Sequence, residues 1–320
     1  MREHLAQHFA AVCEAYGIVV AGAYEPMRAG YVALVHRVCG DDGRVYVFKT
    51  YDDARPISRM ILPTLTALTH ATVWLERQPG MHDRIVAPIN SREPVRTGAY
   101  TTVVFPYIDG VTPREVPLSD VQLRHLVYTV ATMHTLSADA LGFAGVPRED
   151  FDAVWTNDIL PALQRVDTPD HVLFAVFAGR AGRLAAQFRA FRHRATQLAG
   201  RDLHGVVCHT DIHGYNVVIH QDMPLLIDWE GMKVAPKEHD LLFWYGTARW
   251  ELVWQTYRTV HPDAQIDLAL IDYYRMRRLF EDIIQDVERI EQELPVGQEC
   301  TDLSQQIASA LAVLDEMSAN

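Results

Sequence analysis

The segment VVCHTDIHGYNVVIHQDMPLLIDWE, residues 206–230, carries three side chains whose types and spacing suit one kind of chemistry. Asp211 and Asn216 lie in a polar loop between two apolar runs, and Asp228 follows the second run. A tight turn at residues 220–223 would join two short strands and bring Asn216 and Asp228 to the same open end of a hairpin. An amide oxygen and a carboxylate make a hard, all-oxygen site that suits Mg²⁺.

A further carboxylate beside such a metal site completes what phosphoryl transfer requires of a protein. Asp211 can orient and deprotonate the attacking hydroxyl while the metal bridges the phosphates. Lys49 is a candidate cation for the α- and β-phosphates. It lies in the apolar run RVYVFKTY, in a chain whose other basic residues are almost all arginines. A lysine that reaches solvent from the end of such a strand is the plainer alternative.

The sequence divides into a β-rich first part and a helical second part. Strands are expected at residues 17–25, 31–40, 44–51, 85–89 and 101–108, with helices at 3–16 and 56–78. Helical periodicity then predominates, at residues 118–136, 150–165, 171–200, 237–260, 267–293 and 302–317. We therefore expect an α+β protein with lobes at residues 1–106 and 107–320, joined by a hinge near residues 105–112.

Composition excludes several classes of protein. The net charge of −12 argues against a nucleic-acid binder that relies on neutralising phosphates. The four cysteines show no paired spacing, which indicates free thiols in a reducing compartment. No apolar run is long enough to span a bilayer, and the first residues lack the pattern of a secretory signal. We expect a cytoplasmic protein with a small-molecule partner, and no nucleic acid, membrane or obligate protein partner.

The pattern H-x-D-x-x-x-x-N at residues 209–216, followed by IDWE and preceded by a strand lysine, resembles the protein-kinase-like fold. In detail it resembles the aminoglycoside phosphotransferase family. The runs VAPKEHDLLFWYG and DYYRMRRLFEDI look most like those of spectinomycin phosphotransferases. The resemblance implies a bilobal fold and a small-molecule kinase that uses ATP, or GTP, with Mg²⁺.

The same resemblance implies roles in catalysis. Asp211 would be the catalytic base, Asn216 and Asp228 the metal ligands, and Lys49 the phosphate-binding cation. Asp240 would support the catalytic loop through hydrogen bonds.

Further residues are expected around the nucleotide. Backbone groups of the hinge at Phe105 and Tyr107 would contact adenine, and Gly30 would lie in the loop over the phosphates. His209 is expected to support the loop by hydrogen bonds to its backbone rather than to take part in catalysis. Trp229 and Trp244 are expected in the core.

Two features depart from the family pattern. The loop over the phosphates has one glycine, Gly30, and no G-x-G-x-x-G. The helix at residues 56–78 has no glutamate before Glu76 to pair with Lys49. Lys49 would then pair with Glu76, with a carboxylate such as Asp52, or with none. A P-loop kinase is excluded, because no G-x-x-x-x-G-K-[ST] occurs.

Three functions remain open. The first is phosphorylation of an aminoglycoside or aminocyclitol antibiotic, which would confer resistance. Its cationic acceptor would be bound by Glu281 or Asp282 on a helix of the second lobe. The second is a kinase of a metabolic alcohol such as choline, homoserine or a sugar, and the third is a catalytically silent nucleotide-binding protein. A zinc site formed by the histidines is disfavoured, since no cysteine pairs accompany them; these are His204, His209, His213 and His220.

Overall fold

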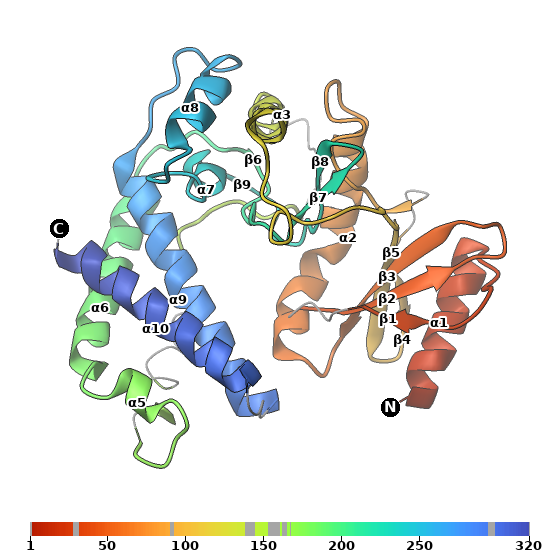
Figure 1. Cartoon of the computed structure of the whole chain (residues 1–320), viewed down its shortest axis with the longest axis horizontal. Coiled ribbons are helices and arrows are strands. Elements are labelled where there is room, and N and C mark those ends of the chain that lie inside the picture. The colour runs from red at the N-terminus through yellow and green to blue at the C-terminus, as the bar shows by residue number, and fades with distance from the viewer. Residues whose placement is uncertain are drawn as a thin grey trace. The chain divides into compact units, whose positions relative to one another are not determined.

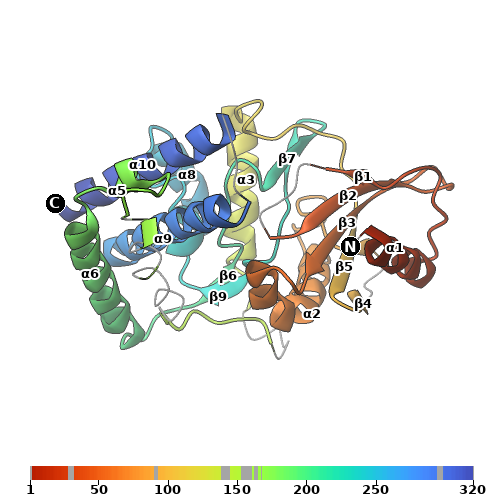
Figure 2. The same cartoon turned by 90° about the horizontal axis from the view of Figure 1, so that it is seen from below.

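The structure is a computed structural model of the 320-residue chain. It describes residues 2–27, 32–89, 93–137, 145–152, 161, 165–166, 168–293 and 298–319. The chain forms two compact units, coloured along the sequence in Figures 1 and 2. Unit 1 contains Met1–Arg148 and Gly205–Ala264, and unit 2 contains Glu149–His204 and Gln265–Asn320. These units follow a different division from the expected lobes, whose boundary near residues 105–112 stays a prediction.

Unit 1 contains a five-stranded antiparallel sheet in the order β1-β2-β3-β5-β4. Its strands are β1 (Glu25–Pro26), β2 (Leu34–Cys39), β3 (Val45–Asp52), β4 (Val95–Thr97) and β5 (Tyr100–Pro106). The expected strands at 17–25 and 85–89 are largely wrong. Apart from the start of β1, each run contains one isolated bridge, at Val20 and Ile85. Gly22 has φ 132° in the first run, and Pro88 lacks a backbone donor in the second.

The two faces of this sheet carry different helices because side chains alternate along each strand. On one face, Phe48 of β3 packs with Phe9 of α1 (Arg2–Tyr16). On the other, Tyr51 of β3 packs with Leu65 of α2 (Pro56–Glu76). Lys49 is two residues from Tyr51 and therefore shares the face of α2.

The remainder of unit 1 includes two small antiparallel sheets, β6–β9 and β7–β8. Their strands are β6 (Val206–Cys208), β7 (Val217–His220), β8 (Met223–Leu226) and β9 (Lys233–Ala235). The expected hairpin is confirmed, with Val217 opposite Leu226 and positive φ at Gln221 and Asp222, as a two-residue turn of the primed type requires. Trp229 is buried in the adjoining core, and Trp244 packs against it, as expected.

The helices follow the predicted periodicity, with breaks that the periodicity did not show. In unit 1, α3 (Asp120–Met133) begins with a capping box at Ser119. The expected helix 237–260 is instead α7 (Glu238–Leu241) and α8 (Trp250–Arg258), separated where Gly246 takes φ 76°.

Unit 2 is helical in its described part. It contains α5 (Phe174–Phe177), α6 (Ala181–Ala199), α9 (Leu268–Glu293) and α10 (Gln298–Ala319). The break between α5 and α6 coincides with Gly179 at φ 73°. Aromatic rings join α6 to α9, with Phe191 stacked on Tyr273 at a centroid separation of 5.1 Å. Most of the expected helix at residues 150–165 lies outside the described residues. Among the described residues, no helix has the length and apolar character needed to cross a membrane.

Candidate functional site

The loop between β6 and β7 carries Asp211, and its backbone is held by Asp240 of α7. One oxygen of Asp240, Oδ2, accepts a hydrogen bond from the His209 N–H at 3.0 Å. The other, Oδ1, accepts from the Thr210 N–H at 2.6 Å. Asp240 is completely buried, so these charge-assisted hydrogen bonds are shielded from water. They are the contacts that a carboxylate supporting the loop requires.

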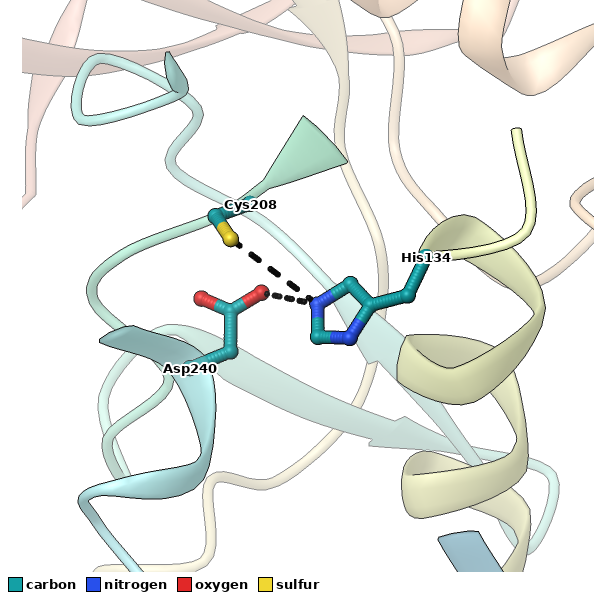
Figure 3. Close-up of side chains that lie close together, drawn as sticks. All are labelled: His134, Cys208 and Asp240. Carbon is teal, nitrogen blue, oxygen red and sulfur yellow. Dashed lines mark hydrogen bonds and ion pairs between the residues drawn. The ribbon is translucent and has the colours of Figure 1, made fainter. Parts of the chain in front are cut away.

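A buried hydrogen-bond network adjoins Asp240, and Figure 3 shows two of its side chains, His134 and Cys208, beside Asp240. The Nδ1 atom of His134 lies 2.9 Å from the Tyr257 hydroxyl, and its Nε2 lies 3.0 Å from Asp240 Oδ2. Burial raises the pKa of Tyr257, so the phenol stays protonated and donates to Nδ1. Nε2 then carries the proton and donates to Asp240.

Cys208 also belongs to this buried group, and its thiol donates to a backbone carbonyl. Its Sγ lies 4.0 Å from His134 Nε2 and donates to the Ala235 carbonyl at 3.4 Å. Within the described residues, His134, Cys208 and Asp240 are the one group with metal-ligand proximity. Hydrogen bonds account for that proximity. The four histidines considered for zinc lie outside this group.

The loop passes through a strained residue beside Asp211. Thr210 has φ 73°, a conformation that β-branched side chains rarely adopt. Its hydroxyl donates to the Gly231 carbonyl at 2.8 Å. A Cβ at Gly231 would lie 2.4 Å from the Thr210 Oγ1, so glycine is required for this close approach. The strain is therefore maintained by contacts from both Asp240 and residue 231.

Asp211 and Asn216 are in direct contact across the loop. The Asn216 Nδ2 donates to Asp211 Oδ2 at 2.8 Å and to its backbone carbonyl at 2.9 Å. The Asn216 Oδ1 is therefore directed away from Asp211. His213 accepts the Tyr215 N–H at Nδ1, which leaves the proton on Nε2, 3.3 Å from Asp211 Oδ2. The Asp211 side chain is 33% exposed, so its carboxylate is accessible from solvent.

The hairpin places Asp228 beside this loop. The Ile227 N–H donates to the Asn216 carbonyl at 3.0 Å, which extends the β7–β8 pairing to the residue before Asp228. His209 adds a second link, because its Nε2 donates to the Ile227 carbonyl at 2.9 Å while its Nδ1 accepts the Asp211 N–H. His209 thus bonds to backbone groups, as expected. Asp228 itself has φ 70°, a second strained residue at the site.

Lys49 reaches this end of the hairpin from β3. Its Nζ lies 2.8 Å from Asp228 Oδ1 and also forms an ion pair with Glu230. The Tyr51 hydroxyl donates to Glu230 as well. Burial, followed by the charge of Asp228, raises the pKa of Tyr51, so this phenol remains a donor.

The expected partners of Lys49 are wrong. Glu76 contacts His82 at 3.1 Å, and Asp52 accepts the Ala54 N–H. The alternative of an unpaired Lys49 is also contradicted by its two ion pairs. Glu76 ends α2, and the face of this helix toward the sheet is apolar, so it places no carboxylate near Lys49.

Part of the backbone of the expected hinge is hydrogen-bonded within the sheet. The Tyr107 N–H donates to the Val45 carbonyl at 3.0 Å, and Phe105 lies opposite Val47 in the same alternating set of hydrogen-bonded pairs. Backbone groups of Phe105 and the Tyr107 N–H therefore point toward β3. The carbonyl of Pro106 points to the other edge, where β4 pairs with β5 only at residues 100–102. Gly30 lies outside the described residues.

The two candidate substrate carboxylates of α9 are both paired with arginines. The Glu281 Oε1 accepts from Arg277 Nε at 2.8 Å, and Arg277 also contacts the buried Glu149. Asp282 pairs with Arg278 at 2.9 Å and is 40% exposed. Glu281 is 31% exposed and shares Arg277 with the buried Glu149, and Asp282 is the more exposed of the two carboxylates.

Sequence reasoning missed three residues of the site. Glu230 is the last residue of the IDWE run and follows Asp228 by two residues, but the sequence analysis predicted no role for it. Tyr51 is two residues from Lys49 on β3, and this spacing predicts that both side chains lie on one face. His134 had no local signal, because its partner Asp240 lies 106 residues away in the sequence.

Comparison with known proteins identifies relatives of this chain. A family model described as "Phosphotransferase enzyme family" matches residues 24–279. Protein StrN of Streptomyces griseus is 28% identical over 169 residues, which cover 49% of this chain and 53% of StrN. The chain thus spans about half the length of this curated relative.

Solved structures share the fold over nearly the whole chain. Spectinomycin phosphotransferase APH(9)-Ia, in complex with ADP and spectinomycin, has a TM-score of 0.69 at 18% identity and covers 98% of both chains. Amicoumacin kinase hAmiN, in complex with AMP-PNP, Ca²⁺ and Ami, has a TM-score of 0.63 at 13% identity, covering 99% of this chain and 96% of that one. The macrolide 2′-phosphotransferase MphH from Brachybacterium faecium has a TM-score of 0.55 at 15% identity, covering 94% and 96%. The expected α+β, kinase-like fold is confirmed.

Proposed function

The chain belongs to the phosphotransferase enzyme family, and we propose that it transfers the γ-phosphoryl group of ATP, or GTP, to a hydroxyl of a small molecule. One observation carries the proposal. Asp211 and Asn216 are in direct contact, and the hairpin brings Asp228 beside them with Lys49 at 2.8 Å from its carboxylate. A base, two oxygen donors and a cation at one place are the parts that phosphoryl transfer needs.

The donor set fits Mg²⁺. The Asn216 Nδ2 is engaged by Asp211, so its Oδ1 is the amide oxygen left for a metal. Asp228 is 40% exposed and contacts Lys49 through one of its two oxygens. An amide oxygen, a carboxylate oxygen and water are typical ligands of Mg²⁺. When bound by Asn216 and Asp228, the ion would neutralise charge on the phosphates.

Asp211 is the proposed general base. Its Oδ2 accepts a hydrogen bond from Asn216 and lies 3.3 Å from His213 Nε2, and these contacts orient the carboxylate. The oxygen of the acceptor hydroxyl bonds to the γ-phosphorus while the bond between that phosphorus and the nucleoside diphosphate breaks. The proton of the hydroxyl passes to Asp211. A carboxylate is a weak base, which suits a reaction whose hydroxyl proton is lost late.

Lys49 and the hinge would bind the nucleotide. Lys49 stands on a rigid central strand and supplies positive charge to the α- and β-phosphates. Of the backbone groups of Phe105, Pro106 and Tyr107, the Pro106 carbonyl is directed away from β3, and we propose that it accepts a hydrogen bond from the amino group of adenine. The Tyr107 N–H already donates to the Val45 carbonyl, so it is not available as a donor to adenine.

We propose a cationic acceptor, an antibiotic aminocyclitol or aminoglycoside, whose phosphorylation would confer resistance. The support is the combination of Asp282, which is 40% exposed on α9, with solved structures of similar fold that include a spectinomycin complex. Carboxylates bind ammonium groups through charge-assisted hydrogen bonds worth about 1.5–3 kcal/mol each. A metabolic alcohol such as choline is the competing acceptor, because its cationic head would suit the same carboxylate.

A coupled assay of ADP release tests the proposal, with spectinomycin, aminoglycosides, choline, homoserine and sugars as acceptors. We expect a cationic antibiotic to give the highest kcat/KM. Asp211→Asn should keep nucleotide affinity and lose about 10²- to 10⁴-fold in kcat, the usual contribution of a positioned general base.

Two results of this assay would count against the proposal. Nucleotide binding without turnover on any acceptor would favour the catalytically silent alternative. Wild-type turnover in Asp211→Asn would remove this residue from the mechanism.

A further inference from the structure

The sheet face that carries Lys49 is covered by a helix surface without charge. Leu65 of α2 packs against Tyr51, and Ile61 and Leu62 lie half-buried beside it. The first carboxylate of α2 is at its last residue, where it contacts a histidine of the following turn. The positive charge of Lys49 must therefore be balanced from another part of unit 1.

Glu230 provides that balance. Lys49 Nζ forms an ion pair with Glu230, and the two side chains are only 12% and 10% exposed. The Tyr51 hydroxyl donates to the same carboxylate. Lys49 and Tyr51 are two residues apart on β3, so their side chains lie on the same face of the sheet. Both contact Glu230 from that face.

Asp228 also contacts Lys49 but is less suited to hold it during the reaction. It is 40% exposed, against 10% for Glu230, and it is the proposed metal ligand. A metal on Asp228 competes with Lys49 for that carboxylate. Glu230 is more enclosed and bonded to Tyr51, so it stays with the lysine when a metal nucleotide binds.

We infer that Glu230, held by Tyr51, positions Lys49 for the nucleotide phosphates in place of a carboxylate from α2. The inference rests on the proposed function, since it concerns the nucleotide site of that reaction. Glu230 is a positioning residue that acts through Lys49. Its removal leaves Asp228 as the carboxylate that Lys49 contacts in the described part of the chain, so lysine and metal then compete for one group.

A double-mutant cycle tests whether Glu230 acts through Lys49. The variants are Glu230→Gln, Lys49→Met and the double variant, with Glu76→Gln as a matched control at the end of α2. Calorimetry gives the Kd of Mg·AMP-PNP for each. We expect Glu230→Gln to weaken binding about 10- to 100-fold, the range for a hydrogen bond to a charged group. In the Lys49→Met background its effect should fall below about 2-fold, and Glu76→Gln should match the wild type.

A role as metal ligand gives a different result. Glu230→Gln would then raise the Mg²⁺ concentration needed for half-maximal binding by the same factor with and without Lys49, and this would overturn the inference. An unchanged Kd in Glu230→Gln alone would also overturn it.

Tyr51→Phe provides a second cycle if Glu230→Gln does not fold. It keeps the carboxylate and removes one hydrogen bond. The inference is supported if Tyr51→Phe raises the Kd of Mg·AMP-PNP in the wild-type background but not in the Lys49→Met background. An equal rise in both backgrounds contradicts it. Binding is measured without acceptor, so absence of transfer to every alcohol would refute the proposed function and leave the cycle valid.

Discussion

Asp240→Asn is the substitution that most directly tests how the catalytic loop is held. Asp240 is completely buried and accepts from the N–H groups of His209 and Thr210 and from His134 Nε2. The asparagine has one acceptor oxygen and one NH₂ group. If the oxygen stays with Thr210, the NH₂ faces both His209 N–H and His134.

The structure sets the size of the effect. His134 can recover one contact by moving its proton to Nδ1, because the Tyr257 hydroxyl can accept as well as donate. One or two hydrogen bonds to a charged acceptor are then lost, at about 1.5–3 kcal/mol each. The free energy of unfolding should fall by about 1.5–6 kcal/mol, which corresponds to a decrease in Tm of about 5–20 °C for a unit of this size.

Activity should fall further than stability alone explains. Thr210 is held at φ 73° partly by its N–H bond to Asp240. A loop that relaxes this strain displaces Asp211, and a displacement of about 1 Å lowers turnover about 100-fold. Thermal unfolding and kcat are measured together, with Tyr257→Phe as a control that removes a more distant hydrogen bond and costs about 1 kcal/mol. An Asp240→Asn enzyme with wild-type kcat and Tm would refute this account of the loop.

The remaining predictions concern the metal, the acceptor and pH. Asp228→Ala should abolish Mg²⁺-dependent nucleotide binding in calorimetry, and unchanged affinity would place the metal elsewhere. Asp282→Asn should raise the acceptor KM about 10-fold without changing that for ATP, whereas Glu281→Gln should chiefly lower Tm. Burial, and then the charge of Asp282, raise the pKa of Asp286 to about 6. The folded chain therefore binds more protons than the unfolded chain between pH 4 and 6, so this group lowers stability as pH rises through that window. Asp286→Asn should remove the loss of stability that Asp286 causes as pH rises, and it should stabilise the protein by about 1 kcal/mol at pH 7, a value reduced for partial solvent exposure. The prediction is contradicted if the denaturation curves of the variant and the wild type coincide at both pH 4 and pH 7.

The parts of the site that the sequence predicted are those set by local spacing. The β7–β8 hairpin follows from two short apolar runs and a two-residue turn, and it brings Asn216 and Asp228 together without any distant contact. Lys49 was identified from its unusual residue type in an apolar strand. Its contact with Asp228 bridges 179 residues of sequence, and no local pattern specifies which carboxylate it meets.

The errors in the fold have a common physical cause. Helical periodicity reports which face of a segment is buried, and it continues through a turn if the next helix packs on the same core. The breaks at Gly179 and Gly246 depend on a positive φ that glycine permits but does not require. Likewise, the run at 85–89 is apolar because it packs in the core, and Ile85 pairs at a single bridge with Leu226 rather than in a strand.

If the acceptor binds as proposed, the arginines of α9 decide which of its two carboxylates is available to an ammonium group. An exposed pair four residues apart, such as Arg278 with Asp282, contributes about 0.3–0.5 kcal/mol. An ammonium group can therefore displace Arg278 from Asp282 at little cost. Arg277, in contrast, is only 14% exposed and is shared by Glu281 and the 2%-exposed Glu149, so separating it from Glu281 costs more than separating Arg278 from Asp282. Selectivity for a cationic acceptor should therefore depend on Asp282, with Glu281 held in its ion pair with Arg277.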